Sequence, residues 1–280
     1  MWVLAVLAAH WYLSLFTQTF FHHRYAAHRM FTMSKGWERL FYVLSFFFQG
    51  ASYLTPRAYA ILHRMHHAYA DTELDPHSPK YDKNLFAMMW RTRNVYKAIF
   101  EHATVVEPKF SKDLPDWDKF DKFASNGYIR LMWVAIYIGL YFAIGAAWWL
   151  YPLIIIHAIM GPFHGMIINW FAHSIGYFNF KVQDTSRNLM PVDLIMLGEG
   201  LHNNHHKHSG RANFAWHKYE FDPVYPVIKL LAFLKVIKIR KIMTSPESEL
   251  PTVELSNVEL QPVMQSTPHV MNNNSLEKVG

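Results

Sequence analysis

Two long stretches of the chain carry no charged side chain. Residues 1–22 contain no Asp, Glu, Lys or Arg, and neither do the 50 residues from Leu131 to Phe180. Runs of this length are typical of membrane-spanning helices, because roughly 20 apolar residues cross the ~30 Å hydrocarbon layer of a bilayer. With 51% hydrophobic and only 17% charged residues, the chain is not expected to be an ordinary soluble globule.

The pattern of these runs predicts about three crossings. Met1 to His22 fits a retained span better than a cleaved signal peptide, because it lacks a basic start and a small-residue cleavage site. The run 129–174 is long enough for two crossings, and an aromatic cluster with a proline at 148–152 interrupts it, which predicts a hairpin. The apolar part of 37–53 is short for a crossing, so we expect an interfacial helix there.

The basic residues predict the orientation of these helices. All 27 Lys and Arg lie at Arg24 or later and the turn near Pro152 has none. The positive-inside rule therefore places 24–127 and 181 onward in the cytoplasm. Residues 224–242 mix five cations with aliphatic side chains, which predicts a basic amphipathic helix on the inner membrane surface.

Composition also sets the domain boundaries and the partner class. Ser, Pro, Glu and Asn dominate after residue 243, so we expect one domain over 1–243 and a disordered tail over 244–280. The pI near 9.3 accompanies apolar spans, which favours an anionic lipid bilayer as the partner; we expect no nucleic-acid binding.

Histidine is concentrated in three windows. Eleven of the 18 histidines lie within 22–28, 63–77 and 202–208. The second and third windows, HRMHH and HNNHH, both place a histidine before two more at i+3 and i+4, and on a helix these three rings share one face. The chain has no cysteine, so nitrogen and oxygen must hold any metal. This repeated pattern predicts a site for one metal, or for two metals a few ångströms apart.

Two further pairs of polar residues bear on this site. His23 and His28 are five residues apart, which separates their rings by about 140° on an ideal helix. They cannot both face one metal unless the helix ends there or the two bind different metals. Asn169 and His173 are four residues apart, so they share a helix face and are expected to close the site from the membrane side.

The remaining histidines are given structural roles. His10, His157 and His164 lie in the apolar runs, where histidines usually find hydrogen bonds within a helix bundle. His269 lies in the tail and is expected to be exposed to solvent.

Membrane parity gives an independent argument for this topology. Residues that bind one metal centre must emerge on the same side of the bilayer, so an even number of crossings must separate successive clusters. The predicted hairpin supplies two crossings between the second and third windows. An interfacial helix at 37–53 supplies none between the first and second windows.

The number of donors constrains the chemistry. Nine nitrogen donors exceed the four of a structural zinc and suit two metals of five- or six-fold coordination with a position left open. Such a pair favours oxygen activation. Motifs of zinc proteases, serine hydrolases, phosphate loops and dinucleotide-binding folds are absent from the sequence. A metal centre mounted on membrane spans suggests an oily substrate that enters between the helices and a cytoplasmic cap.

Three segments resemble the histidine boxes of the membrane fatty acid desaturases, particularly the acyl-CoA Δ9 desaturase group. They are HHRYAAHR, HRMHHAYADTELDPHSP and GEGLHNNHHKH, and NWFAHSIGY is similar to the segment that supplies that group's further histidine. The resemblance covers roughly 10–242. It implies an all-α integral membrane protein with about three transmembrane helices, interfacial helices and a cytoplasmic helical cap that holds a di-metal site. The implied ligands of two iron ions are His23, His28, His63, His66, His67, His173, His202, His205 and His206, with Asn169 holding a water on one metal.

The resemblance also implies the reaction. Di-iron and O₂ remove two hydrogens from an unactivated methylene pair of a saturated acyl-CoA or acyl-lipid, which leaves a cis double bond, expected at Δ9. Two electrons come from an external carrier, cytochrome b5 in animals and often a ferredoxin-like protein elsewhere. The compact form suggests a protein of the bacterial inner membrane with its active site on the cytoplasmic face.

Two features depart from the animal members of this family. Those enzymes have an additional N-terminal span, whereas this chain begins one span before the first box. They also place Arg-Asp just before the second box, where it helps to bind coenzyme A, and this chain has Ile61-Leu62. A phospholipid-bound or carrier-protein-bound acyl chain is therefore an alternative to the thioester. Arg91 and Arg93 are candidates to meet an anionic head group, with ordinary inner-face charges as the alternative.

Two other functions compete with desaturation. A di-iron hydroxylase has a similar ligand set but inserts oxygen into the alkyl chain, so its product is an alcohol and not an alkene. A metal transporter also uses many histidines, but its sites are expected near the bilayer midplane on broken helices. Here the clusters lie beyond the spans.

Overall fold

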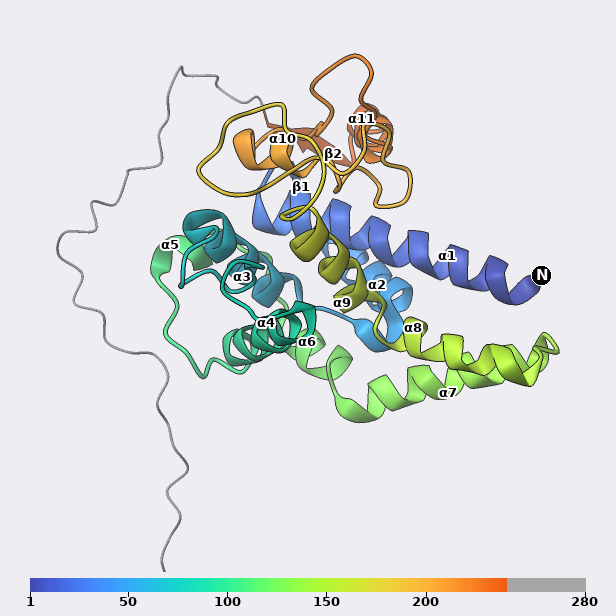
Figure 1. The fold of residues 1–280 in the computed structure, drawn as a ribbon. Helices are drawn as coiled ribbons and strands as arrows, with labels where there is room; N and C mark the ends of the chain where they lie inside the picture. Colours follow the sequence, from blue (N-terminus) through green and yellow to red (C-terminus); the bar gives the residue numbers. More distant parts are fainter. Residues whose placement is uncertain (241–280) are drawn as a thin grey trace, which may run out of the picture. The chain divides into compact units, whose positions relative to one another are not determined.

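The computed structural model describes residues 1–240, and most of them are helical (Figure 1). The predicted helical class is therefore confirmed in outline, but the chain is not purely α. Two short strands, β1 (Phe31–Met33) and β2 (Ile237–Ile239), form an antiparallel pair in which Phe31 lies opposite Ile239. The predicted disordered tail over 244–280 lies outside the described residues.

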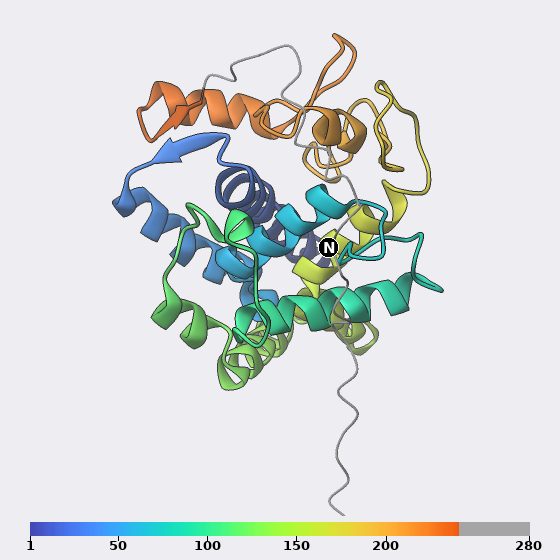
Figure 2. The ribbon, with the colours of Figure 1, turned by 90° about the vertical axis from the view of Figure 1, so that its left-hand side faces the viewer.

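The first charge-free run forms the longest helix. It extends without a break from Trp2 to Ala27, and consists of α1 (Trp2–Thr17) followed by the π-helical segment η1 (Gln18–Ala27). In Figure 2 this helix is viewed nearly end-on, with the other helices around it. At 26 residues it is long and apolar enough to cross a bilayer, and its far end carries the first histidine window.

The segment predicted to be interfacial forms α2 (Lys35–Gln49). Ser34 begins this helix by accepting a hydrogen bond from the Trp37 amide. Its 15 residues span about 22 Å, short of the hydrocarbon thickness, and it buries one aromatic face that includes Phe41 and Phe46. The short 3₁₀ turn η2 (Gly50–Ser52) leads from α2 to the next helix.

The second histidine window lies on α3 (Pro56–Tyr69). Thr55 caps this helix by accepting a hydrogen bond from the Ala58 amide, and Pro56 occupies the first turn, where its missing N–H costs nothing. α3 packs on η1 and on α4 (Leu85–Phe100). Two short helices, α5 (Pro108–Ser111) and α6 (Asp118–Ala124), follow.

The second charge-free run folds back on itself, as predicted. α7 (Gly127–Ala143) is followed by the 3₁₀ segment η3 (Trp148–Leu153) and α8 (Ile154–Ala158), and α8 returns alongside α7 (Figure 1). α9 (Met160–Met166) and the π-helical η4 (Ile167–Phe171) continue after a bend of 71°. Pro162 explains this bend, because it has no N–H to donate to the Ala158 carbonyl and its ring collides with that carbonyl.

The number of crossings is not confirmed as three. By length and composition, the described residues contain one helix that can cross a membrane, or two if the bent pair formed by 148–158 and 160–171 is a single span. α7 is apolar but has only 17 residues, about 26 Å of helix.

The C-terminal part of the described chain forms the cap, which we define as residues 172–240. It contains α10 (His202–Lys207), α11 (Val224–Phe233) and β2. The predicted helix over 224–242 is wrong over 234–240, where the described residues end. The amides of Lys235 and Val236 bond back to Ala232 and Leu231, and Lys235 adopts φ +58°, a Schellman ending that stops the helix. The β-branched residues that follow then pair with β1.

Candidate metal centre

The structure brings together all nine histidines that the sequence singled out as metal ligands. Their nitrogens form two groups, and within each group the candidate ligand atoms lie within 4.8 Å of one another. One group contains five histidines and the other contains four. The first group is His23, His28, His63, His67 and His205; the second is His66, His173, His202 and His206.

The imidazoles of both groups point their Nε2 atoms at one another. In the first group, His205 Nε2 lies 3.0 Å from the Nε2 atoms of both His23 and His67. His28 Nε2 lies 2.8 Å from His63 Nε2. In the second group, the corresponding distances are 3.3 Å for His66 to His206 and 3.1 Å for His173 to His202. Every Nε2 therefore faces the interior of its group.

The π-helical winding of η1 explains how His23 and His28 reach the same group. In this winding each amide bonds to the carbonyl five residues earlier, and the His28 amide donates to the His23 carbonyl at 3.1 Å. Residues five apart then lie above one another, and the 140° separation expected for an α-helix disappears. η1 ends at Ala27, so the helix end that the sequence left open also lies between the two histidines, and two different metals are not needed.

Both histidine triplets divide between the two groups. On α3, His63 and His67 enter the first group while His66 enters the second; on α10, His202 and His206 share the second group while His205 enters the first. Residues four apart point in nearly the same direction, and the residue between them is turned by about 100°. The two groups thus share both helices.

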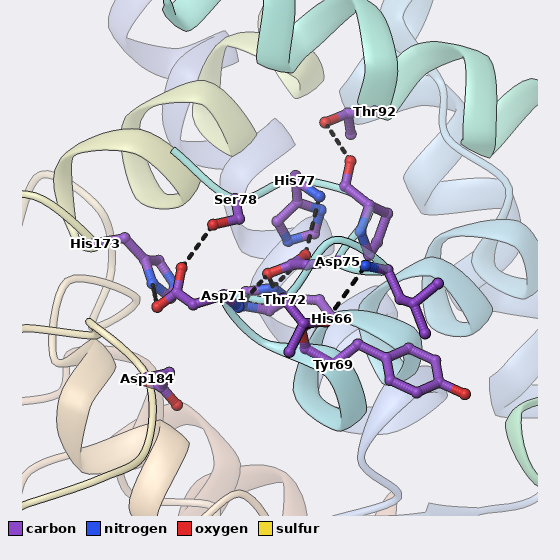
Figure 3. A network of polar contacts seen from close by, with 12 residues as sticks. His66, Tyr69, Asp71, Thr72, Asp75, His77, Ser78, Thr92, His173 and Asp184 are labelled. Atoms are coloured by element: carbon purple, nitrogen blue, oxygen red, sulfur yellow. Dashed lines mark hydrogen bonds and ion pairs between the residues drawn. The ribbon is translucent and has the colours of Figure 1, made fainter. Parts of the chain in front are cut away.

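Carboxylates hold the opposite ring nitrogens of several of these histidines. His66 Nδ1 lies 3.0 Å from both oxygens of Asp75 (Figure 3), and His206 Nδ1 lies 2.9 Å from Asp184. An acceptor at Nδ1 places the ring proton there and leaves the Nε2 lone pair free, which is the arrangement that metal ligands need. Asp71 stands near His173 in the same network, with an Oδ2 to Nδ1 distance of 3.8 Å.

Glu199 does the same for the first group and also ties the cap to η1. Its Oε2 lies 2.6 Å from His23 Nδ1, and its Oε1 accepts a hydrogen bond from Thr19. Arg24, fully buried, lies 3.5 Å from Glu199 and 2.8 Å from Asp222 of the cap. Breaking the ion pairs of a buried guanidinium costs free energy, because it leaves an unpaired buried charge. This network therefore fixes the cap against η1 at the metal centre.

The two asparagines within HNNHH position α10. Asn203 and Asn204 are buried. Their backbone amides donate to the Asn188 side-chain oxygen at 3.0 and 3.2 Å, respectively. The Asn204 side chain also donates to Glu220 and to the Phe214 carbonyl, at 2.9 Å each. A helix of six residues cannot hold its own orientation, so these bonds set the direction of its histidines.

Sequence reasoning gave no role to these supporting residues. Asp71 and Asp75 follow the last histidine of the second triplet by four and eight residues, and Glu199 precedes the third triplet by three. A carboxylate close to a histidine cluster was the signal available. His77, also in the second window, is buried against His66 with ring centroids 4.2 Å apart, and neither of its nitrogens has a hydrogen-bond partner among the described residues.

The charge state of the histidines suits a metal. Burial, reinforced by the neighbouring imidazoles, holds the pKa of His28, His63 and His67 well below the usual value, and the same holds for the three histidines of α10. These rings are therefore neutral at physiological pH. Facing lone pairs at these distances repel unless a proton or a cation lies between them, so the donor set fits two bound cations that prefer imidazole.

A cavity of about 820 Å³ adjoins the centre. His63, His202 and Glu199 line one part of it, and much of the remaining wall is apolar. Asn169 also lines this cavity. The helix containing Asn169 ends at Phe171, so His173 reaches its group from the following turn and not from a shared helix face, contrary to the expectation from spacing. The other lining residues used below are Leu15, Leu54, Leu62, Phe86, Trp90, Arg93, Lys97, Glu101, Arg130, Gly161, Pro162, Gly165, Ile168 and Met196.

The remaining sequence candidates lie away from the two groups. His10 and His157 face each other with their Nδ1 atoms 2.6 Å apart, and His157 Nε2 lies 3.0 Å from the Tyr141 hydroxyl, as befits a structural pair. His164 faces the cavity, and neither of its nitrogens has a hydrogen-bond partner among the described residues. His269 lies outside the described residues.

Known proteins resemble the chain over most of its length. The family model for fatty acid desaturase matches residues 1–229. The chain belongs to the fatty acid desaturase family. This confirms the resemblance seen in the histidine boxes, and the family is associated with membranes.

Individual desaturases show the same relationship. An sn-1 stearoyl-lipid 9-desaturase of Synechocystis is 33% identical over 228 residues, which cover 79% of this chain and 65% of that protein. An sn-1 stearoyl-lipid 9-desaturase of Anabaena variabilis is 30% identical over 76% of this chain and 74% of its own length. An acyl-CoA C20 Δ5-desaturase of Anemone leveillei is 29% identical over 79% of this chain and 67% of its own. Desaturases similar to this chain therefore include acyl-lipid and acyl-CoA enzymes.

Proposed function

We propose that this protein is a membrane di-iron desaturase that introduces a cis double bond at Δ9 of a saturated acyl chain, carried by a lipid or by coenzyme A. The observation that carries the proposal is the pair of facing imidazole groups beside a largely apolar cavity of about 820 Å³. The similarity to two stearoyl-lipid 9-desaturases supports the position of the double bond.

The nine histidines are the proposed ligands, with Asn169 as the residue that holds a water beside one metal. Two iron ions bound by these residues would supply the chemistry that activates O₂. In the overall reaction, two hydrogens leave adjacent methylene carbons, and with two electrons and two protons they reduce O₂ to two waters. The chain contains no recognisable reductase motif, so an external carrier such as cytochrome b5 or a ferredoxin-like protein is the proposed electron source.

The protein's own residues supply position and a dry environment. Leu15, Leu54 and Leu62 help to line the cavity beside the centre, where they exclude water from an alkyl chain. His63 and His202 line the same cavity, so a chain bound there lies next to both groups. Holding one carbon pair at that point is the geometric contribution to catalysis.

We further propose that α1 with η1 forms one crossing, that α7 and the bent α8–α9 segment form a hairpin, and that the metal centre lies on the cytoplasmic face of a bacterial inner membrane. The absence of charges from 131–180 and the cations from Arg24 onward support this topology. A bent span suits a position beside a cavity, because protein and not lipid surrounds its irregular backbone.

Expression in a host deficient in unsaturated fatty acids tests the function. We expect gas chromatography of the host lipids to show new monounsaturated chains that depend on oxygen, with the double bond at Δ9. Hydroxylated chains in their place would identify a hydroxylase. If neither product forms when iron and reductant are supplied, the desaturase proposal is wrong.

A further inference from the structure

The cavity opens along one side of α4. Five residues of α4 and its end, Phe86, Trp90, Arg93, Lys97 and Glu101, line the cavity and are also exposed at the surface. They are spaced by three or four residues, so they form one stripe on the helix. Residues that line the cavity and are also exposed at the protein surface mark the rim of an opening. The opening therefore runs along the length of α4 as a slot.

Residues of α9 without long side chains form part of the cavity wall. Gly161, Pro162 and Gly165 of α9 line the cavity there. A Cβ atom placed on Gly165 meets only the Asn169 side chain, at 3.9 Å, so the space beside it is open. The room beside Gly165 suits a long thin acyl chain better than a bulky head group, whereas Gly161 already packs against the Ser52 carbonyl.

The rim is apolar at one end. Phe86 is 80% exposed and Trp90 is 63% exposed. Exposed aromatic side chains at an opening are typical of a surface that meets the bilayer at its interface. The slot therefore faces lipid and not open solvent.

The other end of the rim carries two available cations. Arg93 lies over the Trp90 ring at 4.9 Å and donates to the neutral Asn94 side chain at 3.0 Å, so it has no carboxylate partner. The Lys97 ammonium has one exposed carboxylate, Glu101, at 3.6 Å. The other arginines nearby are engaged. Arg91 bonds to Asp82 at 2.6 Å, and Arg130 donates to the carbonyls of Ala51 and Tyr53 at 2.7 and 2.8 Å. Among the residues lining the cavity, Arg93 and Lys97 are the cations left for an anionic ligand.

We infer that the acyl chain enters this slot sideways from the bilayer while it is esterified to a glycerophospholipid, with the phosphodiester between Arg93 and Lys97. Arg93 and Lys97 beside the single carboxylate of Glu101 give a net charge of one, which matches the single negative charge of a phosphodiester. Coenzyme A carries several phosphates and an adenine that need a more basic and more hydrated groove. This inference rests on the proposed function and specifies its substrate class.

A binding competition tests the inference without turnover. Purified protein in detergent micelles is loaded with a fluorescently tailed phosphatidylglycerol, which is then displaced by distearoyl phosphatidylglycerol, distearoylglycerol or stearoyl-CoA. The test variant is Arg93→Gln with Lys97→Gln. The control is Lys119→Gln with Lys122→Gln on α6, which removes the same charge away from the cavity. Thermal unfolding of each variant checks that it is folded.

We expect distearoyl phosphatidylglycerol to displace the probe at a lower concentration than either competitor. The test variant should weaken phosphatidylglycerol binding roughly tenfold, as expected for two partly exposed charge contacts, and should leave the phosphate-free distearoylglycerol unchanged. The control should bind like the natural protein.

Two outcomes overturn the inference. Tighter binding of stearoyl-CoA than of phosphatidylglycerol would assign the slot to the thioester, and equal phosphatidylglycerol binding by natural protein and test variant would remove the head group from this rim. Because binding needs no O₂, electrons or chemistry, these results are independent of the expression test. Tight phospholipid binding without an alkene product counts against the proposed function alone.

Discussion

At the scale of single residues, the metal centre depends on side chains that are not among its proposed ligands. Asp75, Asp184 and Glu199 each lie within 3.0 Å of the Nδ1 atom of a histidine. Although burial raises its pKa, the neighbouring His23 and Arg24 hold the pKa of Glu199 below the usual value. A carboxylate that stays ionised keeps the ring proton at Nδ1 and the lone pair at Nε2.

Replacement of Glu199 by Gln should therefore lower iron affinity by roughly 10- to 100-fold, because the amide orients and polarises His23 more weakly. Iron content by elemental analysis, after dialysis against a graded series of chelator concentrations, measures this change. Glu73→Gln, at an exposed position near the second box, is the control and should keep full iron content. Unchanged iron affinity in Glu199→Gln would show that this carboxylate is not needed at the centre.

Two of the proposed ligands can be removed singly. His66→Ala and His205→Ala should each abolish the unsaturated product while the protein still inserts into membranes, because each empties one position of a different imidazole group. His269→Ala and the exposed His217→Ala should have no effect. The lipids of the expression host report activity, and the membrane fraction reports insertion. Full activity in His66→Ala or His205→Ala would show that the ligand assignment is wrong.

Much of the candidate site could be predicted from the sequence, because the spacing of the histidines indicates which rings share a helix face. The triplets on α3 and α10 follow from the geometry of an α-helix, and the family resemblance supplied the remaining positions. The carboxylate partners could not be predicted in the same way. Glu199 meets His23 across 176 positions of the chain, and no local rule connects residues that only the fold brings together.

At the scale of elements, the structure departs from expectation where the backbone leaves ideal helix geometry. The π winding of η1 brings together His23 and His28, which the α-helical period separates. The bend before α9 follows from Pro162, and α11 ends early because Lys235 adopts a left-handed conformation. A proline marks its own position in a sequence. No residue type marks a change from α to π winding, or a lysine that ends a helix, in the same way.

Gly50 shows how tightly two elements can meet. It ends α2 with φ +52°, and a Cβ atom there would collide with the Tyr137 hydroxyl of α7. Gly50→Ala should destabilise the protein by roughly 2 to 4 kcal/mol, through overpacking and an unfavourable backbone conformation. Thermal unfolding in detergent measures the loss. Gly127→Ala is the control, because no other atom lies within 4 Å of a Cβ atom there. Equal melting temperatures of the two variants would contradict the close contact between Gly50 and Tyr137.

At the scale of the whole molecule, the sequence predicted the helical class and the folding back of the second apolar run, but not how the run is divided. Hydropathy does not distinguish apolar residues that face lipid from those that line a cavity. Ile168, within that run, lines the cavity. The crossing count therefore depends on tertiary packing around the cavity and not on composition alone.

One buried acid should make the stability of the molecule depend on pH. Asp121 on α6 accepts a hydrogen bond from Tyr53 at 2.7 Å, and burial, with Asp116 and Asp118 nearby, raises its pKa from 3.8 to about 7. Between these values Asp121 is ionised in the unfolded chain and protonated in the folded one. This residue therefore costs stability as the pH rises from about 4 to 7, by about 4 kcal/mol in total.

Asp121→Asn should remove that cost while it keeps an oxygen to accept the Tyr53 hydrogen bond. The variant should melt at the same temperature as the natural protein near pH 4 and at a higher temperature at pH 7, with a difference that grows between the two. Melting curves in detergent at a series of pH values test this. A constant difference across the series would show that Asp121 titrates normally.

The unusual winding of η1 has a consequence for natural variation in chain length. If one residue between His23 and His28 were deleted, an ordinary α-helical turn would stack the two rings again, whereas an added residue has no common helix type to accommodate it. Tolerance of length changes should thus be one-sided at this position. Insertions and deletions in the first box can be scored by growth of the host deficient in unsaturated fatty acids. Variants with one residue deleted should support growth, and variants with one residue added should not.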